Sequence, residues 1–169
     1  MSHITAGHGP GGEMFLHVQA KRAGKIKGEC QQAGHLDDIQ VHSWRWGMQQ
    51  SSALGSTQAL SRRSFDALTI VKGVDQATTG LMAALCTNDE IKEARLSMRK
   101  SGGGQEEYFV ITLARARIVK VSHEGRTDGS TAETVEFTFN KVDVEYRPQK
   151  STGSRGGATS FSDEFSEDV

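Results

Sequence analysis

The sequence predicts a mainly β protein, an antiparallel two-sheet β-barrel or sandwich with one short flanking α-helix. Most of the chain alternates apolar and polar residues with a period of two, which is typical of strands that bury one face. Gly-rich breaks separate these stretches, and apolar residues recur at helical spacing in just one place, near residues 78–87. Two longer stretches also change their apolar phase midway, as strands with a β-bulge do.

The first predicted strands precede residue 49. Residues 14–18 and 25–30 are short extended stretches. A longer strand over 39–48 turns its first apolar residues to one face and its later ones to the other: Ile39 and Val41, then Trp44, Trp46 and Met48. This slip of one residue predicts a β-bulge near His42 and Ser43.

A long polar segment and the helix follow. Residues 49–63 are polar and aperiodic, which predicts a long loop, and loops of this length usually have a function. Extended structure resumes over 64–71. The helix is predicted over 78–87, with Thr78 as its N-cap and Asn88 near its end.

Three strands complete the predicted barrel. Alternation at 94–98 predicts a half-buried strand, and the Ser-Gly-Gly-Gly turn at 101–104 leads into a strand over 108–121. The latter begins with apolar residues on both faces, so we expect it to be central. The last strand, 133–146, changes its buried phase from Val135, Phe137 and Phe139 to Val142, Val144 and Tyr146. A second bulge is therefore predicted near residues 140–141.

The chain has 169 residues, which suits one domain with a sizeable core. Residues 1–13 are rich in Gly and His and predict a flexible leader before the β domain of residues 14–150. Residues 151–169 predict a tail that is first rich in Gly and Ser and then acidic. Two Phe in this tail are a hint that it docks on something, but a solvated tail is the favoured interpretation.

Composition excludes several classes of function. The formal net charge is −1, so no basic or acidic excess indicates nucleic acid or a charged membrane as a partner. No apolar stretch approaches the ~20 residues of a membrane span, and the first residues lack the apolar core of a signal peptide. Two cysteines are too few for a disulfide framework and favour a reducing compartment. If the protein leaves a cell, we expect a dedicated machine to carry it.

The candidate chemical sites are weak. Cys30, His35 and His42 have a spacing that invites a metal, but no second close pair completes four ligands, so no metal site is predicted. Glycines 102–104 precede a strand instead of a helix, which favours a hairpin turn over a phosphate cradle. The sequence also lacks a nucleophile elbow. We therefore expect no cofactor and no enzymatic activity.

The segment Trp44-Arg45-Trp46 is more informative. In a strand its two indoles lie on one face and Arg45 lies on the other. The two Trp are expected to join the core together with Phe137 and Phe139. Arg45 is then either a solvated residue or part of a recognition surface.

Six segments carry a family resemblance, with Ser-Trp-x-Trp-Gly and Tyr-x-Pro-Gln as their most specific motifs: residues 15–18, 26–30, 39–47, 68–78, 94–103 and 133–149. In this order and spacing they resemble the Hcp family (haemolysin-coregulated protein), the tube subunit of the bacterial type VI secretion system. Thr79 stands where the family often has Pro, and the acidic end does not match the commoner family termini.

The resemblance implies a β-barrel that forms homohexameric rings, which stack head to tail into an inner tube with a wide channel. Sheath contraction would expel this tube, whose partners would be spike, sheath and baseplate components and small effector proteins in the channel. The protein would be cytoplasmic before firing and extracellular afterwards.

The resemblance also implies roles for particular residues. Arg45 and Ser43 would face the channel. The polar loop would contact the neighbouring ring through Gln49, Gln50, Ser51, Ser52, Leu54, Ser56, Thr57, Gln58 and Leu60. The rival interpretation is a monomeric β-barrel that binds a small ligand, with the two Trp lining its pocket.

Overall fold

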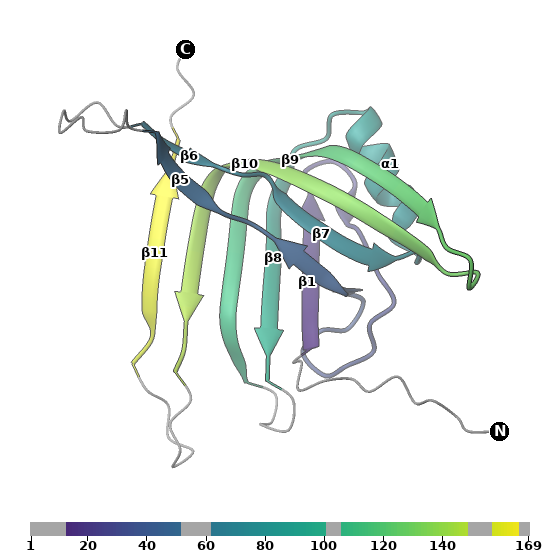
Figure 1. The fold of residues 1–169 in the computed structure, drawn as a ribbon, viewed down its shortest axis with the longest axis horizontal. Coiled ribbons are helices and arrows are strands. Elements are labelled where there is room, and N and C mark those ends of the chain that lie inside the picture. Colours follow the sequence, from purple (N-terminus) through teal and green to yellow (C-terminus); the bar gives the residue numbers. More distant parts are fainter. Residues whose placement is uncertain (1–12, 52–61, 101–105, 149–156, 166–169) are drawn as a thin grey trace.

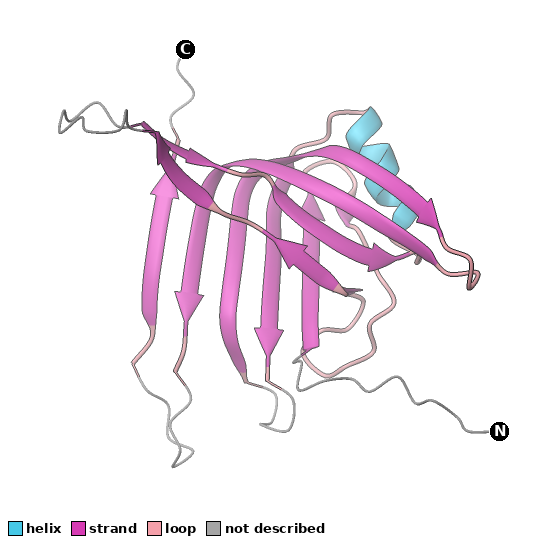
Figure 2. Ribbon diagram, in the orientation of Figure 1, coloured by secondary structure: helices cyan, strands magenta, loops and turns pink. Residues whose placement is uncertain are grey.

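The computed structural model describes residues 13–51, 62–100, 106–148 and 157–165, and it confirms the mainly β class (Figures 1 and 2). The elements within these residues are β1 (Glu13–Ala20), β2 (Gly24–Lys25), β3 (Ile39–Gln40), β4 (Ser43–Arg45), β5 (Met48–Ser51), β6 (Arg62–Phe65), β7 (Leu68–Gly73), α1 (Thr78–Cys86), β8 (Ile91–Arg99), β9 (Glu107–Gly125), β10 (Thr131–Tyr146) and β11 (Thr159–Glu164). The predicted turn at 101–104 lies outside the described residues.

Nearly all of these strands belong to one antiparallel sheet. Its order is β2, β1, β8, β9, β10, β7, β4, with β3 also paired to β1 and β11 also paired to β10. The long strands β9 and β10 bend, so their lower parts lie beside β8, β1 and β11 while their other parts cross over with β7 (Figure 1). The sheet therefore folds over on itself as a partly open barrel, and α1 packs against β9.

The segment 39–45 connects the two edges of this sheet. The N–H of Val41 donates to the carbonyl of Met14 in β1 at 3.0 Å, and that of His42 donates to Val71 in β7 at 2.8 Å. The prediction of one bulged strand over 39–48 is wrong, because the chain forms β3, β4 and β5 there. The apolar phase changes because the chain changes its pairing partner.

The second predicted bulge does not lie near residues 140–141, although the change of buried face there is real. The ladder of β9 and β10 shifts its register between Glu136 and Phe137 instead. Phe139 lies opposite Ala116 and Lys141 opposite Ala114, so the register of β9 and β10 is unchanged across this level. Arg115 has a φ of 47°, in the left-handed region, which interrupts the alternation of β9. Both strands switch their buried face here, from Leu113 to Ala116 in β9 and from Phe137 to Val142 in β10.

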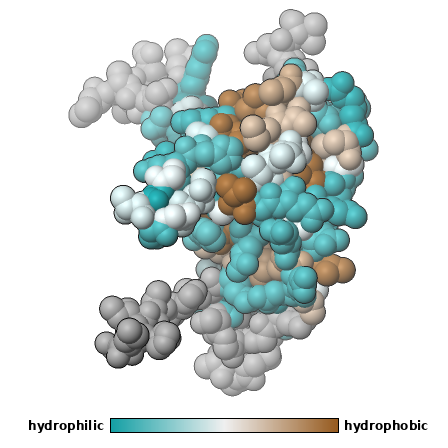
Figure 3. All heavy atoms as spheres, turned by 90° about the vertical axis from the view of Figure 1, so that its right-hand side faces the viewer, coloured by the Kyte–Doolittle hydropathy of each residue, from teal (hydrophilic) through white to brown (hydrophobic). Residues whose placement is uncertain are grey.

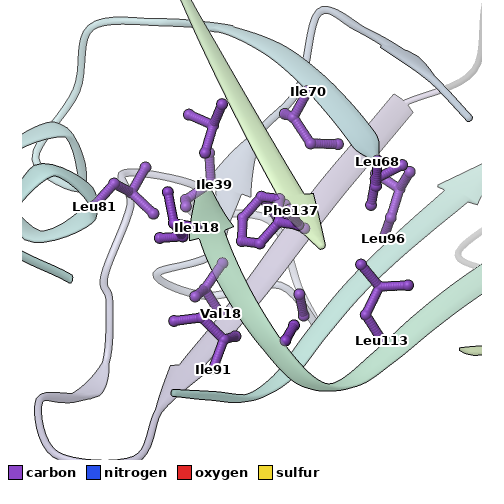
Figure 4. Packing of buried hydrophobic residues seen from close by; sticks show 14 of the residues in the cluster. Val18, Ile39, Leu68, Ile70, Leu81, Ile91, Leu96, Leu113, Ile118 and Phe137 are labelled. Atoms are coloured by element: carbon purple, nitrogen blue, oxygen red, sulfur yellow. The ribbon is translucent and has the colours of Figure 1, made fainter. Parts of the chain in front are cut away.

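The core lies between the two layers of the folded sheet. Figure 4 shows Phe137 among side chains from six other elements. Fully or almost fully buried members of the cluster include Val18, Ile39, Leu68, Ile70, Leu81, Ile91, Leu96, Leu113 and Ile118. Trp44, Trp46 and Phe139 are half-buried and pack against this cluster. An interior filled in this way derives its stability from burial of apolar area.

The helix forms as predicted but starts differently. It covers Thr78–Cys86, and its N-cap is Ala77 instead of the predicted Thr78. No side chain of the described residues caps the start of the helix, and Asp75 Oδ1 instead accepts from the N–H of Ala77 at 2.9 Å in the turn before it. The hydroxyl of Thr78 accepts from the N–H of Asp75 at 3.0 Å. These two bonds hold the turn that leads from β7 into the helix.

The predicted tail is partly a strand. β11 pairs with β10 over six positions, from Lys141 opposite Glu164 to Tyr146 opposite Thr159. The favoured interpretation of a solvated tail is therefore wrong for residues 159–165. The hint from the two Phe was the better guide. Residues 1–12, 149–156 and 166–169 lie outside the described part of the chain.

Candidate assembly surface

The face of β4 that points away from the core carries two of the predicted site residues. Ser43 and Arg45 are exposed, whereas Trp44 between them is half-buried, with its ring centroid 6.1 Å from that of Phe109. Side chains alternate along a strand, so the two neighbours of Trp44 point outward. Arg45 therefore presents a long cation at the surface.

The strands β5 and β6 pair into a two-stranded arm, from Met48 opposite Phe65 to Ser51 opposite Arg62. The predicted loop over 49–63 is wrong at both ends, because its outer residues belong to these strands. Figure 1 shows the arm running over the main sheet toward the end of β11. The exposed polar side chains of the arm remove the alternation that would reveal its strands.

Nine residues were predicted to contact a neighbouring ring. Three of them lie in β5, where Gln49 and Gln50 are exposed and Ser51 is the last residue. The others lie outside the described residues: Ser52, Leu54, Ser56, Thr57, Gln58 and Leu60. Contact with a second ring stays a prediction for all nine.

An aromatic cluster fixes the base of the arm. The ring of Phe65 lies 5.8 Å from that of Trp46, 6.0 Å from that of Phe139 and 4.9 Å from that of Phe165, between centroids. The contact with Phe165 is edge-on, a favourable geometry for aromatic pairs. Residues from the arm, β10 and the end of β11 thus meet in one cluster.

Arg63 makes a second connection between the arm and β11. Its guanidinium binds both carboxylate oxygens of Asp163, with Nη2 3.1 Å from Oδ1, and lies 5.1 Å from the ring centroid of Phe165. The hydrogen bond from Arg63 holds the pKa of Asp163 below its ordinary value. No local motif in the sequence could reveal this pair, because about a hundred residues separate its members.

A shallow apolar cleft of about 320 Å³ lies beside this pair. Met48, Phe65 and Phe161 provide its apolar lining, and Arg63 and Asp163 lie at its rim. Met48 and Phe161 are 49% and 43% exposed, which is high for such large apolar side chains. The junction of arm and β11 therefore leaves apolar surface open to a partner.

A buried charged cluster lies between β7, β10 and the turn before α1. The ammonium of Lys72 and the carboxylate of Glu133 are fully buried and paired. Asp75 Oδ1 lies 2.9 Å from Lys72 Nζ, and His123 Nε2 lies 2.8 Å from Glu133 Oε1. Burial opposes the ionisation of Glu133, but its bonds with Lys72 and His123 outweigh it and lower its pKa. The cluster joins β7, β9 and β10 to the turn before α1.

The residues of the metal motif do not form a set of metal ligands within the residues that the structure describes. His35 is buried, with its ring nitrogens each 3.0 Å from a carboxylate oxygen, of Asp38 and of Glu107. Cys30 is buried and His42 is exposed. In the described part of the chain, no three His, Cys, Asp or Glu side chains are placed to hold a metal ion. His35 instead helps to fix the irregular segment between β2 and β3.

The surface beyond the arm is mixed in character. On the face that carries α1, Figure 3 shows apolar residues interspersed with polar ones. Exposed apolar side chains here and elsewhere include Leu36, Val74, Met82 and Val119. Among the described residues, no helix is long and apolar enough to cross a membrane.

Comparison with known proteins supports one family. Residues 15–146 match the family model described as type VI secretion system effector, Hcp. The chain is 33% identical over 149 residues to protein hcp1 of Pseudomonas aeruginosa, covering 86% of this chain and 89% of that protein. It is also 25% identical over 136 residues to the major exported protein of the same organism, covering 75% and 79%.

Solved structures agree with the fold. Hcp1 from Salmonella typhimurium superposes with a TM-score of 0.75 at 29% identity, over 92% of this chain and 95% of that one. A type VI secretion system effector from Yersinia pestis has the same fold, with a TM-score of 0.72 at 24% identity over 89% and 98%. With the family model spanning β1 to β10, these matches show that the chain belongs to the Hcp family of type VI secretion proteins.

Proposed function

We propose that this protein is a structural subunit of a type VI secretion tube. Six copies form a ring around a channel, and rings stack head to tail through the arm. The arm supports this proposal: its described strands β5 and β6 pair with each other and not with the main sheet, and most of their described side chains are exposed and polar. A ring uses a heterologous interface that closes, and stacking uses a second heterologous interface that does not close and so builds a filament.

Partners and location follow from this role. The subunit folds in the cytoplasm, meets spike, sheath and baseplate components during assembly, and leaves the cell with the tube when the sheath contracts. Small effector proteins occupy the channel, and Arg45 with Ser43 on β4 faces them. The exposure of both side chains supports this placement. The role is structural and needs no enzymatic activity.

The rival function, a monomeric barrel that binds a small ligand, has less support. Its pocket would have to lie inside the barrel, where Phe137 and its neighbours fill the space in the described part of the chain (Figure 4). The two indoles pack against the rings of Phe109 and Phe65.

Shortening the arm tests the stacking role. Ser51 and Arg62 are directly paired, so replacing residues 52–61 with Asn-Gly closes β5 and β6 with a two-residue turn that fits their twist. The variant is expected to form rings that no longer polymerise, because the outer part of the arm is lost and the barrel is untouched. Sedimentation and negative-stain images distinguish rings from tubes.

The same surgery at another turn is the matched control. Gly125 and Thr131 are paired at the ends of β9 and β10, so an Asn-Gly turn can replace residues 126–130 in the same way, which removes three residues there where the change in the arm removes eight. We expect this control to form tubes. Normal tubes from the variant with the shortened arm would contradict the stacking role.

A further inference from the structure

The arm continues from β4 and β7 of the main sheet through two short links, residues 46–47 and 66–67. β5 and β6 pair with each other, and no strand ladder joins them to the main sheet within the described residues. At the base of the arm, the N–H of Asp66 donates to the carbonyl of Gly47 at 2.9 Å. Beyond these links, side-chain contacts with the body therefore help to set the direction of the arm.

β11 is itself firmly attached to that body. Besides its six paired positions with β10, the N–H of Phe165 donates to the carbonyl of Asn140 at 2.7 Å. Arg115 of β9 also reaches across and binds Glu164. β11 is thus a fixed point beside which a less firmly held element can be positioned.

The edge and one face of the Arg63 guanidinium both contact residues at the end of β11. The guanidinium of Arg63 grips the carboxylate of Asp163 with two parallel bonds and covers the ring of Phe165. Planar two-point contacts fix orientation better than a single charge pair does. Phe165 in turn contacts Phe65 edge-on, with 4.9 Å between the ring centroids. Phe65 lies two residues after Arg63 on β6, so both side chains are on the same face of that strand. One side of the arm is therefore held by polar and aromatic contacts together.

We infer that β11 is a strap that holds the arm at one angle to the barrel through Arg63, Asp163 and Phe165. The inference rests on the proposed role of the arm in stacking. An arm held at one angle loses less conformational freedom when it meets another ring, so the strap favours stacking without touching the neighbour. Arg63 is a positioning residue here.

Distances between two spin labels on the same subunit test the strap. One label is placed on the arm by Gln49→Cys and one on β9 by Lys120→Cys, since both residues are exposed. Cys86→Ser removes the exposed native thiol. Labelled subunits are diluted with unlabelled ones in isolated rings, and the distribution of distances is compared with tube length in the same preparations.

Arg63→Gln and Asp163→Asn are expected to broaden the distance distribution and shorten the tubes, while ring mass stays unchanged. The double charge reversal Arg63→Asp with Asp163→Arg restores the pair and should narrow the distribution again. Arg147→Gln is the control, because this exposed arginine pairs with Glu145 at the end of β10.

The two outcomes separate the strap from the proposed function. An unchanged distribution in both single variants would overturn the strap, whatever the tubes do. A broadened distribution with tubes of normal length would support the strap and contradict the role of the arm in stacking.

Discussion

Lys72 and Glu133 are fully buried opposite charges that contact each other, Asp75 and His123. Each ion alone would be costly in the interior, so the stability of the region depends on the pair being complete. The pair also connects two neighbouring strands to the turn before α1. Loss of either residue would therefore leave the other charge buried without its partner.

Removing one partner tests this dependence. Lys72→Met should reduce the free energy of unfolding by about 3–5 kcal/mol, because Glu133 stays buried without its main counter-charge. Lys72→Met combined with Glu133→Leu should recover much of that loss. Urea unfolding followed by tryptophan fluorescence measures both. A double variant that is less stable than the single one would contradict this account.

Arg45 is the residue on which cargo selection is proposed to depend. In the proposed ring its copies would form a band of positive charge, which would attract acidic proteins within about one Debye length of the channel wall. Arg45→Glu should therefore reduce retention of an acidic effector in a pull-down with assembled rings. Ring mass should not change, because the side chain is exposed.

Arg147→Glu is the matched control for this prediction, since it reverses another exposed arginine outside β4. It should leave retention unchanged. Equal retention by the Arg45→Glu variant and by the unchanged protein would contradict the proposed position of Arg45 on the channel wall.

Among the elements, the irregular segment between β2 and β3 depends on one close approach. A Cβ at Gly28 would overlap the backbone of Asp38 and come within 2.8 Å of the Cα of Ile39. The N–H of Gly28 also donates to the carbonyl of Asp37 at 2.8 Å. The backbone of residues 37–39 therefore leaves no room for a side chain at Gly28.

Gly28→Ala should therefore destabilise the protein by at least about 1–3 kcal/mol, because the segment must move away from β3. Gly125→Ala is the control, since a Cβ at that position meets no atom within 4 Å and its φ is not positive. Thermal unfolding of the two variants side by side gives the comparison. Equal midpoints would show that the segment adjusts freely.

Strands that bury one face could be predicted from the sequence. β1, β8, β9 and β10 lie within a few residues of their predicted ranges because alternation reports a half-buried strand directly. The arm and β11 could not, since most of their described side chains are exposed and no alternation results. The break at 39–48 was mistaken for a bulge because both events shift the apolar phase by one residue.

The candidate site shows the same limit. The outward direction of Ser43 and Arg45 follows from the position of Trp44 between them in a strand. The link between Arg63 and Asp163 has no local signal, because it depends on how distant strands are arranged. The two Phe near the end were the available hint, and Phe165 does pack against the base of the arm.

At the scale of the whole molecule, stability should depend on pH in the acid range. Asp38, Asp89, Glu107 and Glu133 are largely buried, and burial opposes their ionisation. Hydrogen bonds from neighbouring cationic side chains or backbone N–H groups outweigh it and leave each pKa below its ordinary value. The folded protein thus binds fewer protons than the unfolded chain in this range.

This sign predicts that the stabilisation is complete above the ordinary carboxyl pKa values of 3.8 and 4.5 and is lost as the pH falls through the lowered folded values. Urea midpoints should therefore stay level between about pH 6 and 5 and fall steeply below about pH 4. Midpoints that rise on acidification would contradict the assignment of these carboxylates as paired.

Assembly is the central claim for the whole molecule. A single subunit explains neither the exposed arm nor the apolar cleft beside β11, whereas a stack of rings gives both a surface to meet. Weak contacts suffice for stacking because several copies act together between two rings.

The sedimentation mass of the purified protein, with images of the same sample, tests this claim most directly. We expect annular particles of about six times the 18.4 kDa subunit mass. These rings should be in equilibrium with stacks that lengthen as the protein concentration rises. A single species of 18.4 kDa at every concentration would contradict it.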